Sequence, residues 1–219
     1  MEKLKLPELQ QKSRSVPLIM ITGGIGSGKS VVSRILRLNG YNVYDCDAEA
    51  KRIMENDLAV IEALTEILGE EAYIIEEYAS ADRRLNKNFV ASKIFSDSQL
   101  RDMVNAVVHK AVREDVACFA DRCSGVAFCE TAIPSTSHMT EMCDFVWLVT
   151  APEGERIERV KIRNGFSDAE IMQRIHSQRE EFDRIESRKI VNLKNGSDDM
   201  LLPQIFRHIP SALFEEIIF

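Results

Sequence analysis

Short apolar runs alternate along the chain with longer stretches in which apolar residues recur every three or four positions. The runs are rich in strand-forming residues, so they predict buried strands at 16–22, 41–44, 125–129, 145–150 and 189–193. The stretches between them predict helices, and a C-terminal helix is expected after the last strand. Strands separated by helices indicate an α/β layer fold with a mostly parallel sheet.

The first predicted helix spans Lys29–Asn39, with Val31, Ile35 and Leu38 at helical spacing on its apolar side. Glycine readily adopts the left-handed conformation that ends many helices. Gly40 is therefore expected to stop this helix, and the second strand follows immediately.

The middle of the chain shows only the helical pattern. One apolar stripe ends at Gly69, and a longer helix is predicted over Ser98–Arg122. Because no strand pattern is evident from about 50 to 122, this block is predicted to be a helical insertion after the second strand. The stripe contains Leu58, Ile61, Leu64, Thr65 and Leu68, and the apolar side of the longer helix contains Leu100, Met103, Val104, Val107, Val108 and Ala111.

Towards the C-terminus, Ser167-Asp168-Ala169-Glu170 has the sequence of a capping box. It predicts the start of a helix that runs to about Arg188. The inward side of this helix is predicted to hold Ile171, Ile175, Phe182 and Ile185.

Composition and charge argue against nucleic-acid-binding, membrane and secreted proteins. A net charge of -7 at pH 7 argues against a general nucleic-acid binder. No apolar stretch approaches the roughly 20 residues that span a bilayer, so no membrane partner is expected. Residues 1–16 form a polar tail without the apolar centre of a signal peptide, which favours a cytoplasmic protein. The cysteines lack metal-binding spacing and are expected to be reduced thiols.

The stretch "ITGGIGSGKSVV" at 21–32 carries the main chemical signal. Gly23 to Ser30 fit G-x-x-x-x-G-K-[ST] between a predicted strand and a predicted helix, the context that this phosphate-binding motif requires. Glycines let backbone N–H groups turn towards a phosphate, and the helix N-terminus adds positive potential. Lys29 can neutralise the β- and γ-phosphates of ATP, and the Ser30 hydroxyl can bind Mg²⁺. The predicted nucleotide-binding residues are Gly24, Ile25, Gly26, Ser27, Gly28, Lys29, Ser30 and Val31.

Two aspartates, Asp45 and Asp47, follow the second predicted strand at the sheet edge where ligands of open α/β sheets bind. If the backbone keeps alternating, both carboxylates lie on one face. One of them can hold Mg²⁺ through water, and the other can accept a proton from an attacking hydroxyl. Asp47 is also a good N-cap for a helix that begins at "AEAKRIM". The spacing leaves both interpretations open.

Basic side chains cluster on the helix predicted after "VTAPEG". Arg159 and Arg163 are one helical turn apart, a spacing that suits a lid closing over a polyphosphate. The alternative is a solvated face paired with Glu155 and Glu158. The same ambiguity applies to a polar ridge on the long predicted helix. The basic cluster contains Arg156, Arg159, Lys161 and Arg163, and the polar ridge contains Arg101, Asn105, His109 and Arg113.

Four collinear segments, within about residues 18–197, resemble the dephospho-CoA kinase family. They are similar to the family's phosphate loop, its strand followed by a D-A-D segment, its helix ending in His-Pro, and its strand with an arginine-bearing lid and R-I-x-x-Q helix. In this chain the segments read "ITGGIGSGKSVVSRIL", "NGYNVYDCDAEAKRIM", "KIFSDSQLRDMVNAVVHKAV" and "CDFVWLVTAPEGERIERVKIRNGFSDAEIMQRIHSQ".

The resemblance implies a P-loop NTPase fold of three α/β/α layers. It also implies an enzyme that uses ATP to phosphorylate the ribose 3′-hydroxyl of dephospho-CoA, giving CoA and ADP. The implied division is a nucleotide-binding core at 17–49, 116–155 and 179–219, a helical acceptor-binding insertion at 50–115, and a lid at 156–178.

Carried over by position, the resemblance makes Asp47 the base near the acceptor hydroxyl. Lys29 and Ser30 serve ATP and Mg²⁺, and Arg159 and Arg163 become lid residues. The residues that it implies for the acceptor are Lys51, Lys87, Asn105 and His109. Lys51 and Lys87 stand where the family usually has arginine, so they keep the charge but lose the planar two-pronged donor.

The segment "CETAIPSTSHM" at 129–139 departs most from the family pattern. Pro134, Ser135 and Thr136 stand where Leu, Phe and Glu are expected, and Lys110 replaces the proline of His-Pro. Two alternatives therefore stay open. One is another P-loop small-molecule kinase of the nucleoside or nucleotide type, and the other is a nucleotide-binding paralogue without turnover. A monomer is favoured.

Overall fold

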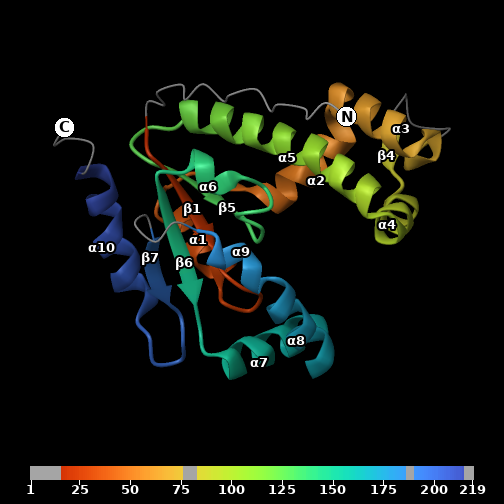
Figure 1. The fold of residues 1–219 in the computed structure, drawn as a ribbon. Coiled ribbons are helices and arrows are strands. Elements are labelled where there is room, and N and C mark those ends of the chain that lie inside the picture. The colour runs from red at the N-terminus through yellow and green to blue at the C-terminus, as the bar shows by residue number, and fades with distance from the viewer. Residues whose placement is uncertain (1–15, 76–82, 186–189, 215–219) are drawn as a thin grey trace.

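The computed structural model describes residues 16–75, 83–185 and 190–214 (Figure 1). Five strands form a parallel sheet in the order β2-β5-β1-β6-β7. This sheet, layered with helices, confirms the predicted α/β class and places β1 at the centre. The strands are β1 (Leu18–Thr22), β2 (Val43–Asp45), β5 (Ala127–Glu130), β6 (Phe145–Thr150) and β7 (Ile190–Lys194).

Alternate residues of β1 pack into cores on opposite faces of the sheet, because successive side chains of a strand point to opposite sides. Leu18 and Met20 belong to the core that contains α5 (Ser98–Asp121) and α6 (Met139–Met142). Ile19 and Ile21 belong to the core that contains α1 (Lys29–Leu38) and α10 (Leu201–Phe214). The sheet therefore lies between two helical layers, with α5 and α10 on different sides of it in Figure 1.

The block between β2 and β5 is mainly helical, as predicted. It contains α2 (Cys46–Asn56), α3 (Leu58–Leu68), α4 (Lys87–Ser96) and α5, with a short 3₁₀ turn, η1, at Glu70–Ala72. The prediction that this block holds no strand is wrong, because β3 (Tyr73–Ile75) pairs antiparallel with β4 (Arg83–Leu85). Strands of three residues are too short to show the alternation by which a strand is recognised.

Of the apolar side predicted for α1, Ile35 packs against the core, but the other two positions are wrong. Val31 and Leu38 are 47% and 79% exposed, whereas the fully buried residues are Val32, Ser33 and Leu36. One residue turns the helix by about 100°. The phosphate loop sets the rotation of α1 against the sheet, and this rotation buries the stripe that starts one position later.

Two other predicted core positions face solvent. Leu58, the first residue of α3, is 73% exposed, and Val60 is buried in its helix instead. Met103 of α5 is 50% exposed, whereas Val104 and Val108 on the same helix are buried as predicted. Each misplaced residue lies at the border of an apolar stripe, where spacing alone does not decide burial.

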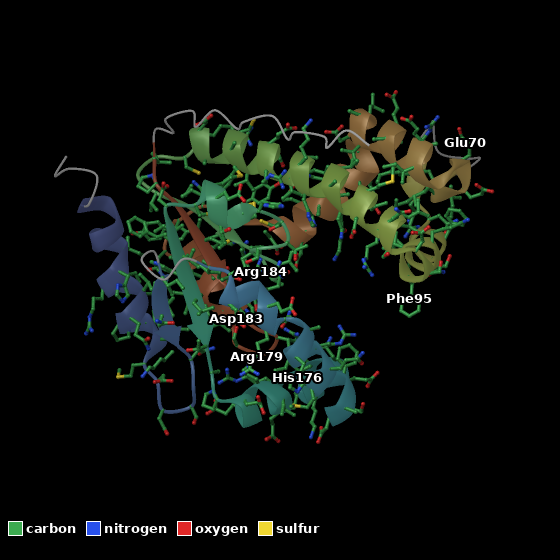
Figure 2. All side chains as sticks on the ribbon, in the orientation of Figure 1. Glu70, Phe95, His176, Arg179, Asp183 and Arg184 are labelled. Atoms are coloured by element: carbon green, nitrogen blue, oxygen red, sulfur yellow. The ribbon has the colours of Figure 1, made fainter. Side chains whose placement is uncertain are left out.

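After β6, the chain forms α7 (Glu153–Asn164), α8 (Asp168–Ser177) and α9 (Arg179–Asp183). The capping box at Ser167 and Glu170 is confirmed. The continuous helix predicted as far as about Arg188 is wrong, because α8 ends at Ser177, and Arg188 lies outside the described residues. Figure 2 shows the side chains of His176 on α8 and Arg179 on α9, and that of Phe95 on α4 in the insertion.

The predicted polar tail at 1–16 lies outside the described residues except for Val16, which is buried. The predicted boundaries at 50, 115 and 156 fall inside α2, α5 and α7 and remain predictions. In the part of the chain that the structure describes, no helix combines the length and apolarity needed to cross a bilayer.

Candidate active site

The phosphate loop, Gly23–Ser30, joins β1 to α1 at the centre of the sheet edge. Gly28 forms the N-cap of α1 with φ 99°, a left-handed conformation that L side chains rarely adopt. A Cβ at this position would collide with the side-chain amide of Asn195, which donates from Nδ2 to the Ser27 carbonyl over 2.8 Å. The loop therefore needs a glycine here, and the residue after β7 braces it.

We predict that Gly28→Ala lowers the melting temperature and abolishes measurable ATP binding. The strain of the left-handed conformation costs about 1–3 kcal/mol, and the new methyl group displaces Asn195. Thermal unfolding and calorimetric titration with ATP measure the two effects. Gly154→Ala is the matched control, because Gly154 has open space around its Cβ direction and no positive φ. Equal behaviour of the two variants would contradict the role of Gly28.

Lys29 is the first residue of α1, and its side chain turns back over the loop. The ammonium donates from Nζ to the Gly23 carbonyl over 2.6 Å. Burial lowers the pKa of Lys29, and the charges of Glu130 and Asp47 oppose that shift. A cation and two carboxylates from three different elements therefore share one site.

Glu130 is a residue that the sequence interpretation missed. It ends β5, the strand beside β1, where it pairs in register with Ile21. Burial raises the pKa of this carboxyl, and the charge of Lys29 lowers it. An acidic residue directly after the apolar run "AFC" was the available signal. Its position on the strand next to the phosphate loop matches that of the acidic residue that serves Mg²⁺ in other P-loop enzymes.

Asp45 and Asp47 have different local roles. Asp45 is the N-cap of α2, where Oδ1 accepts from the backbone N–H groups of Asp47 (3.1 Å) and Ala48 (3.0 Å). The alternative of Asp47 as the N-cap is therefore wrong. The expectation that both carboxylates lie on one strand face is also wrong, because α2 begins at Cys46. Burial, then the charge of Asp45, raises the pKa of Asp47, while Lys29 and Lys51 lower it.

Asp47 is one of the residues that line a cavity of about 80 Å³, here called the acceptor cavity. His109 of α5 lines the same cavity, so two predicted site residues from distant parts of the chain come together. Burial lowers the pKa of His109, and the nearby Arg113 adds to this shift, which favours the neutral imidazole. The lining residues are Cys46, Asp47, Ala50, Val108, His109, Val112, Thr131, Ile133, Ser137 and Met139.

Three other residues implied for the acceptor do not line this cavity. The charge of Lys51 lowers the pKa of Asp47. Lys87 forms a 3.4 Å ion pair with Glu55 near the surface. Asn105 lies half-buried on α5, one helical turn before His109. Their roles toward an acceptor therefore remain predictions.

The lid arginines lie beside the phosphate loop. Arg159 donates to Glu155 (2.7 Å) and to the Asn195 carbonyl (2.8 Å), and it reaches the Gly26 carbonyl at 3.4 Å. The predicted pairing with Glu155 is thus confirmed, and the same guanidinium also contacts the loop. Arg163 is exposed, and its charge lowers the pKa of Lys29.

Arg156 and Gln178 also contact the phosphate loop, although no site role was assigned to them from the sequence. Arg156 donates from Nε to the Ile25 carbonyl over 2.9 Å. The side-chain carbonyl of Gln178, Oε1, accepts from the Ile25 N–H over 2.7 Å. The signals were available in the basic cluster and in the R-I-x-x-Q pattern, whose last residue is Gln178.

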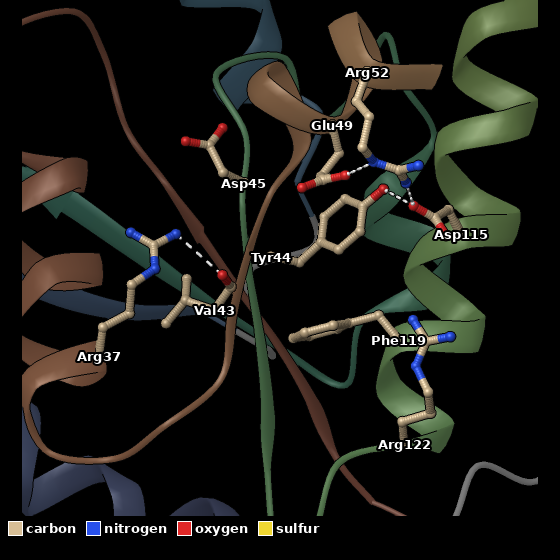
Figure 3. A pocket seen from close by; sticks show the side chains of 9 residues that line it. All are labelled: Arg37, Val43, Tyr44, Asp45, Glu49, Arg52, Asp115, Phe119 and Arg122. Atoms are coloured by element: carbon tan, nitrogen blue, oxygen red, sulfur yellow. Dashed lines mark hydrogen bonds and ion pairs between the residues drawn. The ribbon is translucent and has the colours of Figure 1, made fainter. Parts of the chain in front are cut away.

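A larger hollow of about 250 Å³ lies between β2, α2 and α5 (Figure 3). Its central charges satisfy one another, since Asp115 accepts from Arg52 (2.6 Å) and from the Tyr44 hydroxyl (2.7 Å), and Glu49 also pairs with Arg52. Asp45 lines this hollow, but Asp47 and His109 line only the smaller cavity, and Lys29 lines neither of the two. The candidate chemistry therefore lies at the smaller cavity.

Comparison with known proteins identifies the family of this chain. A family model of dephospho-CoA kinase matches residues 17–199. A dephospho-CoA kinase from Porphyromonas gingivalis is 37% identical over 195 residues, covering 89% of this chain and 93% of the relative. One from Bacteroides fragilis is 34% identical over 201 residues, covering 91% of this chain and 94% of the relative.

Solved structures share the fold. A crystal structure from Thermus thermophilus, 30% identical, covers 91% of this chain and 97% of its own with a TM-score of 0.69. Dephospho-CoA kinase from Campylobacter jejuni has a TM-score of 0.61 at 14% identity, covering 92% of this chain and 99% of its own. The match to the family model includes the phosphate loop, the acceptor cavity and the lid arginines. The chain therefore belongs to the dephospho-CoA kinase family.

Proposed function

We propose that this chain transfers the γ-phosphoryl group of ATP to the ribose 3′-hydroxyl of dephospho-CoA, giving CoA and ADP. The position of Asp47 carries the proposal. Asp47 is a lining residue of the acceptor cavity, and its carboxylate is close enough to Lys29 for each charge to shift the pKa of the other. An acceptor hydroxyl in the cavity would then face the end of a nucleotide held by the phosphate loop.

The phosphate loop provides the donors for ATP. Its backbone N–H groups and the N-terminus of α1 favour an anion, and the ammonium of Lys29 supplies charge for the β- and γ-phosphates. Arg159 and Arg163 complete the positive side of the site from the lid. Arg156, which contacts Ile25 directly, joins them in this proposal.

Magnesium fits this site together with phosphate oxygens. Among residues 16–75, 83–185 and 190–214, no three histidine, cysteine, aspartate or glutamate side chains converge to hold a metal by themselves. Protein Mg²⁺ sites commonly use one or two carboxylates plus substrate phosphates and water. The exposed Ser30 hydroxyl, Glu130, and Asp45 or Asp47 through water would supply the protein ligands. When bound, the ion neutralises charge on the phosphate oxygens.

Asp47 accepts the proton of the acceptor hydroxyl in this proposal. Phosphoryl transfer has a loose transition state, so a weak base suffices when positioning and charge neutralisation carry most of the catalysis. His109, whose pKa is lowered by burial, is a polar residue in the lining of the same cavity. Lys51, Lys87 and Asn105 hold more distant parts of the acceptor.

The proposal divides the chain by task. Residues 17–49, 116–155 and 179–219 form the nucleotide-binding core, residues 50–115 bind the acceptor, and residues 156–178 form the lid. The lid helices carry Arg156, Arg159 and Arg163, and closing them over the nucleotide would exclude water.

The direct test is ADP release from ATP and Mg²⁺ with and without dephospho-CoA. We expect dephospho-CoA to stimulate ADP release and one CoA to form for each ADP, measured by mass spectrometry. Phosphorylation of a nucleoside or another alcohol in its place would favour a different small-molecule kinase. ATP binding without any product would favour a nucleotide-binding protein without turnover.

A further inference from the structure

The short helix α9 and its N-cap residue connect the phosphate loop to the chain segment beside the acceptor cavity, with hydrogen bonds to both. At its N-terminal end, Gln178 accepts from the Ile25 N–H of the phosphate loop over 2.7 Å. One turn later, Glu181 accepts through Oε2 from the N–H groups of Ser135 (2.9 Å) and Thr136 (3.0 Å). The Thr136 hydroxyl donates to the other carboxylate oxygen, and the Ser135 hydroxyl donates to the Glu181 carbonyl over 2.7 Å.

The 131–137 segment that Glu181 holds also forms part of the wall of the acceptor cavity. Thr131, Ile133 and Ser137 line the cavity. From α5, Arg113 donates to the Ser137 carbonyl over 2.8 Å, and the backbone of Thr136 raises the pKa of His109. A ligand that contacts Thr131, Ile133 or Ser137 in the cavity therefore contacts the same segment whose Ser135 and Thr136 donate to Glu181.

Ser135 and Thr136 are two of the positions at which this chain departs from its family's pattern. Their hydroxyls and N–H groups donate four hydrogen bonds to Glu181, three to its side-chain carboxylate and one to its backbone carbonyl. A glutamate at position 136, which the resemblance led us to expect, would place a second carboxylate against Glu181. Bonds to an ionised acceptor are stronger than those between neutral groups. Ser135 and Thr136 therefore strengthen the attachment of their segment to Glu181.

We infer that Glu181 and Gln178 are positioning residues that couple occupancy of the acceptor cavity to the shape of the phosphate loop. The inference rests on the proposed function for the identity of the acceptor. The connection runs from the cavity wall through Ser135 and Thr136 to Glu181, along α9 to Gln178, and then to Ile25. Because this linkage is reciprocal, bound ATP lowers the Kd of the acceptor by the same factor by which the bound acceptor lowers the Kd of ATP.

Hydrogen exchange of backbone amides tests the connection without any turnover. Glu181→Ala is expected to speed exchange at 135–137 and, at a distance, at the phosphate-loop peptide that contains Ile25. Glu180→Ala is the matched control, because Glu180 is exposed and pairs only with Arg184, at 3.3 Å, among the contacts that the structure describes. Faster exchange confined to 135–137 would mean that Glu181 braces its own segment and would overturn the coupling.

Gln178→Ala separates the two ends of the connection. It is expected to speed exchange at the phosphate loop and to leave 135–137 protected. Adding Glu181→Ala to it should cause no further change at the loop. Independent effects of the two substitutions at Ile25 would contradict a single path. Glu181→Gln preserves the side-chain length and one acceptor oxygen, so it keeps the test available if the alanine variant folds poorly.

Binding gives the functional readout. In the wild type, saturating dephospho-CoA is expected to lower the Kd of a non-hydrolysable ATP analogue about five-fold or more. Glu181→Ala should abolish this effect and raise the KM values of ATP and dephospho-CoA together, whereas Glu180→Ala should not. An unchanged ATP KM in Glu181→Ala would overturn the coupling. Absence of CoA formation by the wild type would instead refute the proposed function, and the exchange experiment would still report on the coupling.

Discussion

Replacing Lys29 with methionine is expected to reduce kcat by about 10²–10³-fold or more, and to weaken ATP binding. The ammonium lies over the phosphate loop, donating to the Gly23 carbonyl at 2.6 Å, in a partly buried place where its charge is poorly screened by water. Removing one preorganised donor of this kind costs about 10²–10³-fold in other enzymes. Steady-state ADP release and calorimetric titration with ATP measure the two effects.

Arg34→Met is the control for this substitution. Arg34 lies on the same helix and is exposed to solvent. Burial lowers the pKa of Lys29, so the folded state disfavours the charged form. Lys29→Met should therefore keep or raise the melting temperature, which separates lost chemistry from lost fold. Normal turnover and ATP affinity in this variant would remove the phosphate loop from the mechanism.

Replacing Asp47 with asparagine is expected to lower kcat by roughly 10²–10⁴-fold, the usual contribution of a positioned general base. ATP affinity should remain close to that of the wild type, because Asp47 lines the acceptor cavity and the N-cap of α2 is Asp45. The asparagine has nearly the same shape, so the acceptor can still enter. Asp102→Asn, an exposed change on α5, is the control and should leave kcat unchanged.

The pH dependence gives Asp47 a second, independent readout. Burial, and then the charge of Asp45, raises the pKa of this carboxyl above that of an exposed aspartate. As the pH falls through this raised pKa, Asp47 gains a proton and kcat/KM should decline, at a higher pH than an exposed aspartate would give. Because the folded-state pKa is raised, the carboxylate destabilises the fold at neutral pH. Asp47→Asn should therefore lose this acid limb and raise the melting temperature at pH 7. If Asp47→Asn kept the same decline of kcat/KM at acidic pH as the wild type, Asp47 would not be the general base.

The strand and loop pattern at the nucleotide site could be predicted because local rules decide it. β1 is a continuous apolar run, and the glycines after it meet a conformational demand that few other residues satisfy. The capping box at Ser167 is likewise a contact between residues three positions apart. Such features depend on their immediate neighbours and are therefore visible in a sequence.

The unpredicted features depend on distant partners. Glu130 gains its role only because β5 lies beside β1, more than a hundred residues earlier in the chain. Gln178 ends α8 and reaches Ile25, a contact across 153 positions. The hairpin of β3 and β4 and the buried side of α1 were missed for a related reason. Packing against other elements decides them, and a short or one-sided pattern carries little of that information.

The strand order has a consequence for how the molecule is made. β5 lies between β1 and β2, so the first two strands to leave the ribosome are not neighbours in the sheet. Both expose an unpaired edge until residues 127–130 have been synthesised, while α2, α3 and much of α5 have local contacts available earlier. Insertion of β5 is therefore the event that joins β2 to β1 and delivers Glu130, while the other edge of β1 waits for β6. In a chain that stops short of this strand, both edges remain open to pairing with other chains.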